Sequence, residues 1–333
     1  MKISASRSAR RLTLSACTLA ALAAAAPAAQ AKAAAAELRV EAGQTLTPSQ
    51  TYLTGATRIT TDTRKPACGG SGRKKAVPGP SALSLLIDAA GVKPTLRPLG
   101  ISDKFSFGLL VCSIGRSVAT DDAFWLYKVN HAAPEVGADQ RKVRAGDKVL
   151  WYFSNTATGS NTGDELVLTA PARVKRSTTF DVKVTAYDSA GKRAPAAGAQ
   201  VFYGRQKVTA DAQGVAKVTS GSRRIRLRAV RGKDVASNSA GVCVAKTLSD
   251  CSPVAATTVN GTKGNDRIKG GKGPETIESY GGGDRIDVRG GGRDVVHCGR
   301  GVDRVAISGN DRAARDCEIV NGKRRPARSA LRM

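Results

Sequence analysis

Histidine and aromatic side chains are scarce in this sequence. Its 333 residues include two histidines, which excludes a metal centre built from several histidines and leaves little room for histidine-based catalysis. Aromatic residues make up 4% of the chain, against 36 glycines and 13 prolines. This composition favours two or three small domains rich in turns over one large enzyme core. Past the N-terminus, no apolar run approaches the ~20 residues that span a bilayer.

Motifs of common enzyme classes are also missing. No Gly-rich phosphate loop, Gly-x-Ser-x-Gly elbow or His-Glu-x-x-His pattern occurs, so we expect a protein that is not an enzyme. Positive charge, by contrast, is in excess: 53 Lys and Arg against 27 Asp and Glu, a formal charge of +26. Because the basic residues are spread along the chain and stacking aromatics are few, this excess favours anionic envelope polymers as partners over specific nucleic-acid binding.

The N-terminus has the features of an export signal. Lys2, Arg7, Arg10 and Arg11 precede an apolar stretch over residues 12–26, and Ala29-Gln30-Ala31 fits a small-x-small cleavage site. Residues 1–31 are therefore predicted to be a signal peptide, and the mature chain is predicted to be secreted or held in the cell envelope of a bacterium. Leu14-Ser15-Ala16-Cys17 leaves lipoprotein cleavage as an alternative.

Cleavage after Ala31 would leave an even number of cysteines, which in an exported chain predicts disulfides. Six cysteines allow 15 pairings. They fall two by two along the chain, so the simplest pairing joins neighbours: Cys68–Cys112, Cys243–Cys251 and Cys298–Cys317.

The first segment, residues 37–161, is expected to be a small α+β domain. Ser81 can cap a helix over residues 81–90 that Gly91 would end. Strand-like runs follow at residues 107–115, 124–130 and 147–155.

Residues 124–153 carry a resemblance to a known family. The order Trp125, Tyr127, Val129, Asn130, then Gly146, Asp147, Val149, Trp151 and Phe153 resembles the transcobalamin-like C-terminal domains (DUF4430) over about 100 residues. The resemblance implies a β-grasp-like fold and raises corrinoid binding. The partner helical barrel of the two-domain relatives is absent, so that function does not transfer from the fold. His131 is the candidate axial ligand, with a solvated side chain as the alternative, and both tryptophans are expected in the core.

The second segment, residues 163–246, has short strand-like runs separated by Asp/Gly turns, which predicts a β-sandwich. The stretch GAQVFYGRQKVTADAQGVAKVTS resembles immunoglobulin-like and carboxypeptidase-regulatory-like modules of bacterial surface proteins. Arg224, Arg226 and Arg228 share one strand face. They could bind an anionic polymer or simply be solvated.

The third segment, residues 257–320, repeats with a period of nine. An aliphatic residue two positions after each acid keeps the same spacing. The form Gly-Gly-x-Gly-x-Asp-x-aliphatic-x resembles the hemolysin-type calcium-binding (RTX) repeats, which implies a parallel β-roll with calcium at its turns. The candidate metal ligands are Asp266, Glu275, Asp284, Asp294 and Asp303.

The repeats are degenerate. Pro274 and Tyr280 break the pattern, and the segment holds 11 basic against 10 acidic residues. We therefore expect one or two weak Ca²⁺ sites, with a metal-free glycine-rich solenoid as the alternative. A linker is expected at residues 247–256 and a basic, disordered tail at residues 321–333.

Together these patterns predict a mainly β, multi-domain protein with a β-grasp-like α+β domain, an immunoglobulin-like sandwich and a short parallel β-roll. The expected function is surface binding or adhesion with a calcium-binding C-terminal roll. Small-ligand, corrinoid-like binding by the first domain and binding of anionic polymers are the alternatives.

Overall fold

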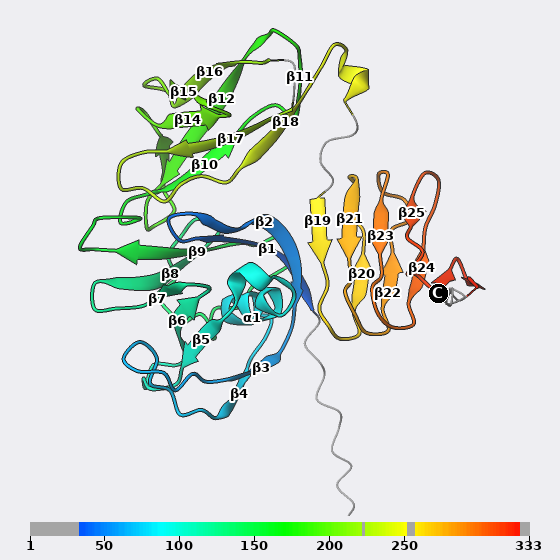
Figure 1. Ribbon diagram of the computed structural model, residues 1–333, viewed down its shortest axis with the longest axis horizontal. Coiled ribbons are helices and arrows are strands. Elements are labelled where there is room, and N and C mark those ends of the chain that lie inside the picture. Colours follow the sequence, from blue (N-terminus) through cyan, green and yellow to red (C-terminus); the bar gives the residue numbers. More distant parts are fainter. Residues whose placement is uncertain (1–32, 222–223, 252–256, 327–333) are drawn as a thin grey trace, which may run out of the picture. The chain divides into compact units, whose positions relative to one another are not determined.

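The computed structural model describes residues 33–221, 224–251 and 257–326. The predicted signal peptide, part of the linker and the last seven residues of the tail lie outside the described residues. As predicted, the fold is mainly β and has several sheets (Figure 1). No helix in the described ranges is long and apolar enough to cross a membrane.

The first domain is built on a mixed sheet with strand order β2-β1-β9-β8. Strand β1 pairs antiparallel with β2 and parallel with β9. The strands of this sheet are β1 (Ala34–Glu41), β2 (Thr45–Thr54), β8 (Ala123–Val129) and β9 (Lys148–Asn155). Two smaller sheets add β3 (Thr57–Thr60) with β4 (Lys74–Val77), and β5 (Leu99–Ser102), β6 (Leu110–Ile114) and β7 (Ser117–Val118).

Helix α1 (Ala82–Val92) covers this sheet, followed by a short 3₁₀ helix, η1 (Pro94–Leu96). The predicted cap is present: the Ser81 hydroxyl accepts the Ser84 N–H at 3.1 Å, and the Ser84 hydroxyl accepts the Ser81 N–H at 2.8 Å. The sequence predicts that Gly91 ends the helix. In the structure Gly91 is still helical, and the helix ends at Val92.

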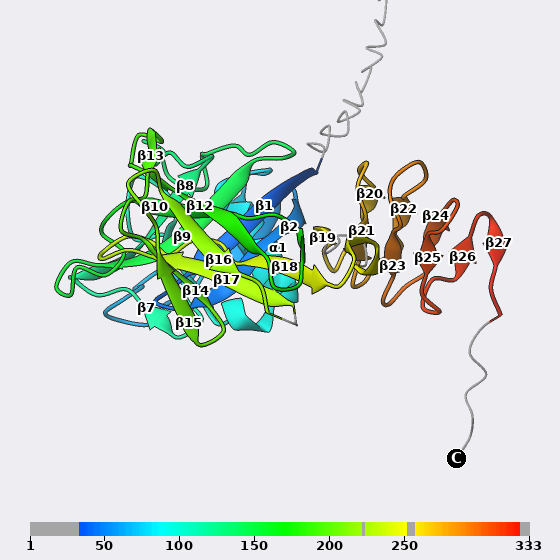
Figure 2. The ribbon, with the colours of Figure 1, turned by 90° about the horizontal axis from the view of Figure 1, so that it is seen from above.

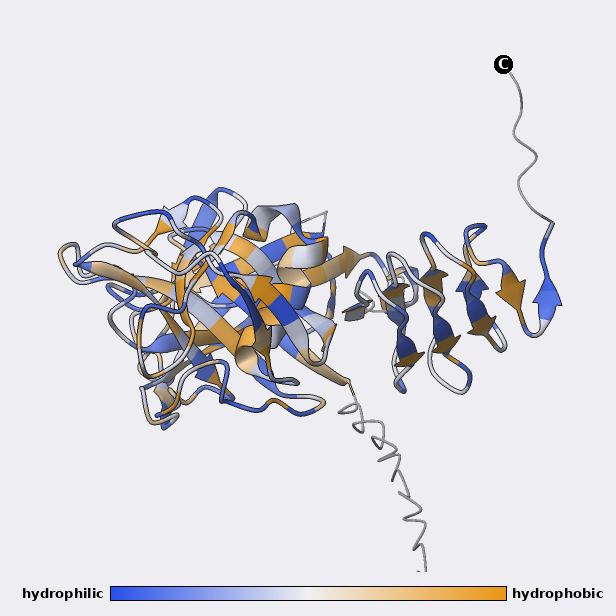
Figure 3. Cartoon of the chain, turned by 90° about the horizontal axis from the view of Figure 1, so that it is seen from below, coloured by the Kyte–Doolittle hydropathy of each residue, from blue (hydrophilic) through white to orange (hydrophobic). Residues whose placement is uncertain are grey.

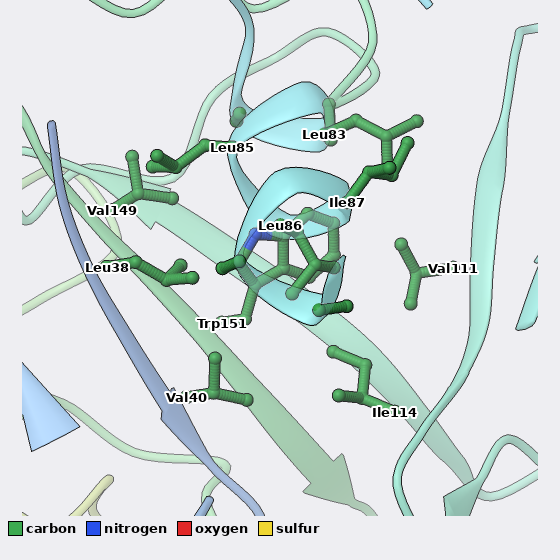
Figure 4. Close-up of a cluster of buried hydrophobic side chains, with 14 of the residues drawn as sticks. Leu38, Val40, Leu83, Leu85, Leu86, Ile87, Val111, Ile114, Val149 and Trp151 are labelled. Carbon is green, nitrogen blue, oxygen red and sulfur yellow. The ribbon is translucent and has the colours of Figure 1, made fainter. Parts of the chain in front are cut away.

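The core of the first domain lies between α1 and the sheet. Leu86 of α1 lies beside Trp151 of β9 in Figure 4, and both are buried. The two tryptophans pack inside, as expected: Trp125 is 5.1 Å from Phe153, and Trp151 is 5.1 Å from Tyr127 between ring centroids.

The second domain consists of two sheets around a core of its own. One sheet contains β10 (Glu165–Thr169), β12 (Thr179–Tyr187), β13 (Arg193–Pro195) and β16 (Val215–Thr219). The other contains β11 (Arg173–Lys175), β14 (Gln200–Tyr203), β15 (Gln206–Thr209), β17 (Ile225–Val230) and β18 (Ala240–Ala245). A short 3₁₀ helix, η2 (Leu248–Asp250), follows within the predicted linker.

Residues 257–326, called the solenoid below, wind through two sheets whose strands are parallel, apart from an antiparallel last strand (Figure 2). One contains β19 (Thr257–Asn260), β21 (Glu275–Glu278), β23 (Val295–His297) and β25 (Arg312–Ala313). The other contains β20 (Arg267–Lys269), β22 (Arg285–Asp287), β24 (Arg304–Ala306), β26 (Ile319–Val320) and β27 (Lys323–Arg324).

The aliphatic residues of the repeat fill the space between these two sheets. Ile268, Ile277, Ile286, Val296 and Val305 are each at most 4% exposed and form one cluster. In Figure 3 the apolar positions of the short strands alternate with polar ones, because neighbouring side chains of a strand point to opposite faces.

Two features of the solenoid differ from expectation. Strand β19 pairs parallel with β2, so one solenoid sheet continues the sheet of the first domain. The basic tail is also not disordered from residue 321, since β27 forms a hairpin with β26. There the Arg325 guanidinium donates to the carbonyls of Ala313 and Ala314 at 3.2 and 2.7 Å.

The packing of α1 gives a testable prediction. Leu86→Ala is expected to lower the free energy of unfolding of the first domain by about 2–5 kcal/mol, because it leaves a cavity beside Trp151. Tryptophan fluorescence during urea denaturation measures it. The control is Leu126→Ala, whose side chain is 36% exposed and should change stability by only about 0.5 kcal/mol. Equal effects of the two variants would contradict the assigned core.

Candidate functional site: two carboxylate ladders in the solenoid

The five acidic residues predicted as metal ligands lie at the start of solenoid strands. Asp284, Asp294 and Asp303 are fully buried, and Asp266 is 8% exposed. Two-residue alternation explains their burial: the acid shares the inward face with the aliphatic residue two positions later, while the residue between them points outward. Arg285, between Asp284 and Ile286, is accordingly exposed.

These carboxylates form two ladders rather than one series. In the first ladder, the Asp266 N–H donates to Asp284 Oδ1 at 2.8 Å, and the Asp284 N–H donates to Asp303 Oδ1 at 2.7 Å. The Asp303 N–H then donates to Glu318 Oε2 at 2.9 Å. Each carboxylate thus accepts a backbone N–H from the coil before it, so side chains join coil to coil.

The second ladder contains the alternate acids. The Glu275 N–H donates to Asp294 Oδ1 at 2.8 Å, and the Asp294 N–H donates to Asp311 Oδ1 at 3.0 Å. Asp311 and Glu318 end the ladders and were missed by the sequence analysis, because the last coil is short and lacks the glycine motif. A search for acids about 18 residues apart, two repeats instead of one, would have pointed to them.

Each fully buried aspartate has an oxygen left over. Oδ2 of Asp284, Asp294 and Asp303 is buried and has no hydrogen-bond partner. Burial raises the pKa of Asp303 and of Asp266 to about 6, and it also raises the pKa of Asp284 and Asp294. The ladders therefore favour a bound proton or a cation at their inner oxygens.

Oxygen donors from the glycine turns lie near some of these atoms. A Cβ built on Gly291 would lie 2.6 Å from the Gly271 carbonyl oxygen and 3.1 Å from Asp294 Oδ2. Both oxygens therefore border the same small space, which only glycine leaves open. Carbonyl and carboxylate oxygens are the donors that a hard cation such as Ca²⁺ takes. Within the described residues, no group of three or more acidic, His or Cys side chains is arranged so that it could hold a metal ion, so backbone oxygens would have to complete any site.

The disulfides join the predicted neighbours: Cys68–Cys112, Cys243–Cys251 and Cys298–Cys317. Cys298 and Cys317 are fully buried and link two coils of the solenoid. The Cys298–Cys317 disulfide closes a loop and lowers the conformational entropy of the unfolded chain. Such a disulfide typically raises the free energy of unfolding by about 2–4 kcal/mol.

His131 is not placed as an open axial ligand or as a solvated side chain. Its Nδ1 lies 3.1 Å from Glu165 Oε1, and its ring stacks on Tyr187 with centroids 4.1 Å apart. The same Glu165 oxygen accepts Arg39 Nη2 at 2.9 Å, and the ion pair is buried. These contacts hold the imidazole in place. A pocket of about 230 Å³ beside Glu165 is smaller than the 300–1,000 Å³ of usual cofactor sites.

Of the three arginines predicted to share one strand face of the second domain, two are exposed and the third forms an ion pair. Arg228 Nη2 donates to Glu41 Oε2 at 2.8 Å, and that carboxylate is buried. Arg224 and Arg226 stay exposed. The first and second domains are therefore joined by ion pairs that the sequence analysis did not predict.

Comparison with known proteins shows a similarity that lies in the first domain. A domain of unknown function (DUF4430) matches residues 102–155, which include strands β6 to β9. This is shorter than the resemblance expected from the sequence and leaves out α1. No curated protein matches the chain. A crystal structure of haptocorrin in complex with Cbi is 16% identical, with a TM-score of 0.25, over 37% of this chain and 25% of that one. A likeness this low carries no argument about this chain.

A pair of substitutions separates the hydrogen bond of a ladder from its charge. Asp284→Ala leaves the buried Asp266 N–H without its acceptor and should destabilise the solenoid by about 1–3 kcal/mol. Asp284→Asn keeps an acceptor and removes the buried charge, so in calcium-free buffer it should be at least as stable as the original chain. Hydrogen exchange of peptides from residues 257–326 measures both. Equal destabilisation by the two variants would contradict the ladder.

The raised pKa values of these carboxyl groups determine whether the solenoid gains or loses stability as the pH rises. A carboxyl whose pKa rises on folding binds its proton more tightly in the folded state, so stability falls as pH rises from about 4 to 6. In calcium-free buffer the solenoid should therefore exchange more slowly at pH 5 than at pH 7, after correction for the intrinsic rate. Asp303→Asn should flatten this dependence. A solenoid that is more stable at pH 7 than at pH 5 would contradict the prediction.

Proposed function

We propose that this chain is an exported, non-enzymatic binding protein whose solenoid takes up Ca²⁺ outside the cell. The observation that carries the calcium part is the set of buried, unpartnered Oδ2 atoms of Asp284, Asp294 and Asp303. The three disulfides fit an oxidising compartment. The proposed role of the metal is structural.

The candidate ligands are the ladder carboxylates together with turn carbonyls. Asp294 and the Gly271 carbonyl are the best placed pair, because they border the same space. Bound Ca²⁺ would neutralise carboxylates that are buried without a cation partner, and it would compete with the protons favoured by their raised pKa.

Several features support weak rather than tight sites. Each turn offers few carboxylates. Exposed basic residues also adjoin the acids in the sequence, as Arg267, Arg285 and Arg304 do. Weak extracellular sites bind in the 10⁻⁴–10⁻³ M range. Such sites would be empty inside the cell and filled after export, so calcium would add stability to the ladders only outside.

The test is hydrogen exchange of the full-length chain at pH 7 in EGTA, in millimolar MgCl₂ and in millimolar CaCl₂. Calcium at ten times its Kd should stabilise residues 257–326 by about 1.4 kcal/mol. Magnesium should do much less, because it needs a stricter octahedral site. Asp294→Asn should reduce the calcium effect, whereas Asp287→Asn should keep it, since Asp287 is half-exposed and paired with Arg289. Exchange that calcium leaves unchanged would remove the calcium proposal.

Corrinoid-like binding by the first domain is the alternative that the family resemblance implies. The DUF4430 match supports the resemblance and says nothing of a ligand. An absorbance titration of the full-length chain with cobalamin decides it, with a spectral shift or retention on a sizing column as the positive result.

A further inference from the structure

The outer face of the sheet β20-β22-β24 carries a row of arginines. Arg267, Arg285 and Arg304 are direct neighbours in the register of the three parallel strands. All three are exposed, because alternation turns them away from the buried acids and aliphatics beside them. Neighbouring strands lie about 4.8 Å apart, so the row repeats at that spacing. We call it the arginine row.

The arginine row is not neutralised by the rest of the described chain. Among the described residues, no carboxylate lies within 4.0 Å of these guanidinium groups, whereas Asp287 on the same sheet is paired with Arg289 at 2.7 Å. Like charges directly opposite one another on neighbouring strands destabilise a sheet. The row therefore costs stability, and the fold alone gives no reason for it.

The opposite sheet supplies an internal comparison. The same repeat position, one residue after the acid, is Thr276 on β21 and Val295 on β23, and these two are also register neighbours. On this sheet an exposed arginine takes the position once, at Arg312 of β25. The solenoid therefore tolerates neutral residues at this position. Arginine is concentrated on one sheet, and Lys269 and the exposed Arg324 of β27 add further positive charge there.

We propose that the arginine row is a docking surface for a linear acidic polysaccharide that lies along the solenoid, across its strands. Guanidinium groups bind carboxylates in a bidentate manner. A linear polymer with one carboxylate per sugar carries negative charge along its whole length, so it can contact several arginines of the row at once. The proposal concerns the outer face and is independent of the calcium proposed at the inner one.

A polysaccharide fits this face better than a nucleic acid. Single-stranded nucleic acids bind through aromatic side chains on which bases stack, and Tyr280 is the one aromatic residue in 257–326. Its hydroxyl donates to Asn260 Oδ1 at 2.8 Å.

The test measures binding of the full-length chain to immobilised oligogalacturonate in EGTA, at 50 and 200 mM NaCl. The variant Arg267→Gln/Arg285→Gln/Arg304→Gln should lose at least tenfold in affinity and bind with a weaker salt dependence. The corresponding triple lysine variant keeps the charge without the bidentate geometry, so it should bind with intermediate affinity.

A matched control removes the same charge elsewhere. Lys183→Gln/Arg193→Gln/Arg205→Gln changes exposed residues of the second domain and should alter affinity by less than threefold. Unchanged hydrogen exchange of residues 257–326 would show that the arginine variant folds. Equal losses in the two glutamine variants, or tighter binding to single-stranded DNA than to oligogalacturonate, would overturn the proposal. Because calcium is removed throughout, this result can be interpreted even if the calcium proposal fails.

Discussion

The solenoid depends on one repeated interaction, in which a buried carboxylate accepts the backbone N–H of the acid one coil earlier. Hydrogen bonds of 2.7 to 3.0 Å repeat this contact along both ladders. The glycine turns allow it, because a side chain at Gly301 would clash with the Gly282 carbonyl. The inward direction of the acids and the outward direction of the residues that follow them are then consequences of the same two-residue alternation.

This hydrogen bond leaves buried negative charge without a partner, and that charge relates the structure of the solenoid to its proposed function. One oxygen of a buried carboxylate serves the backbone, and the other has no partner in Asp284, Asp294 or Asp303. A buried unpaired charge is costly, and this cost is the physical basis of the proposed binding of protons and hard cations by the ladders. The arginines next to the acids do not relieve the cost, because they lie on the outer face. There they create a second, separate electrostatic surface.

Local patterns in the sequence predicted much of this architecture. Ser81 marked the start of α1, and the nine-residue spacing placed Ile268, Ile277 and Ile286 in one core. The order of the cysteines along the chain suggested the three disulfides that the structure contains. These features depend on residues close together in the chain, where periodicity and capping rules apply directly.

Features that depend on distant residues were not predictable. The pairing of β19 with β2 joins residues about 200 positions apart, and the buried Arg39–Glu165 pair that holds His131 has no local signal. The division of the acids into two ladders follows from the number of repeats per coil, which the nine-residue period does not reveal. For the same reason Asp311 and Glu318 were missed.

The most direct test is a carboxyl-carbon NMR titration of the full-length chain with labelled aspartate, with and without calcium. Asp266 and Asp303 are expected to titrate near pH 6 in EGTA, and calcium should move both titrations to lower pH. Titration of both groups near the ordinary aspartate pKa of about 3.9 in EGTA would contradict this prediction. The carboxylates would then be neither buried nor in need of a cation.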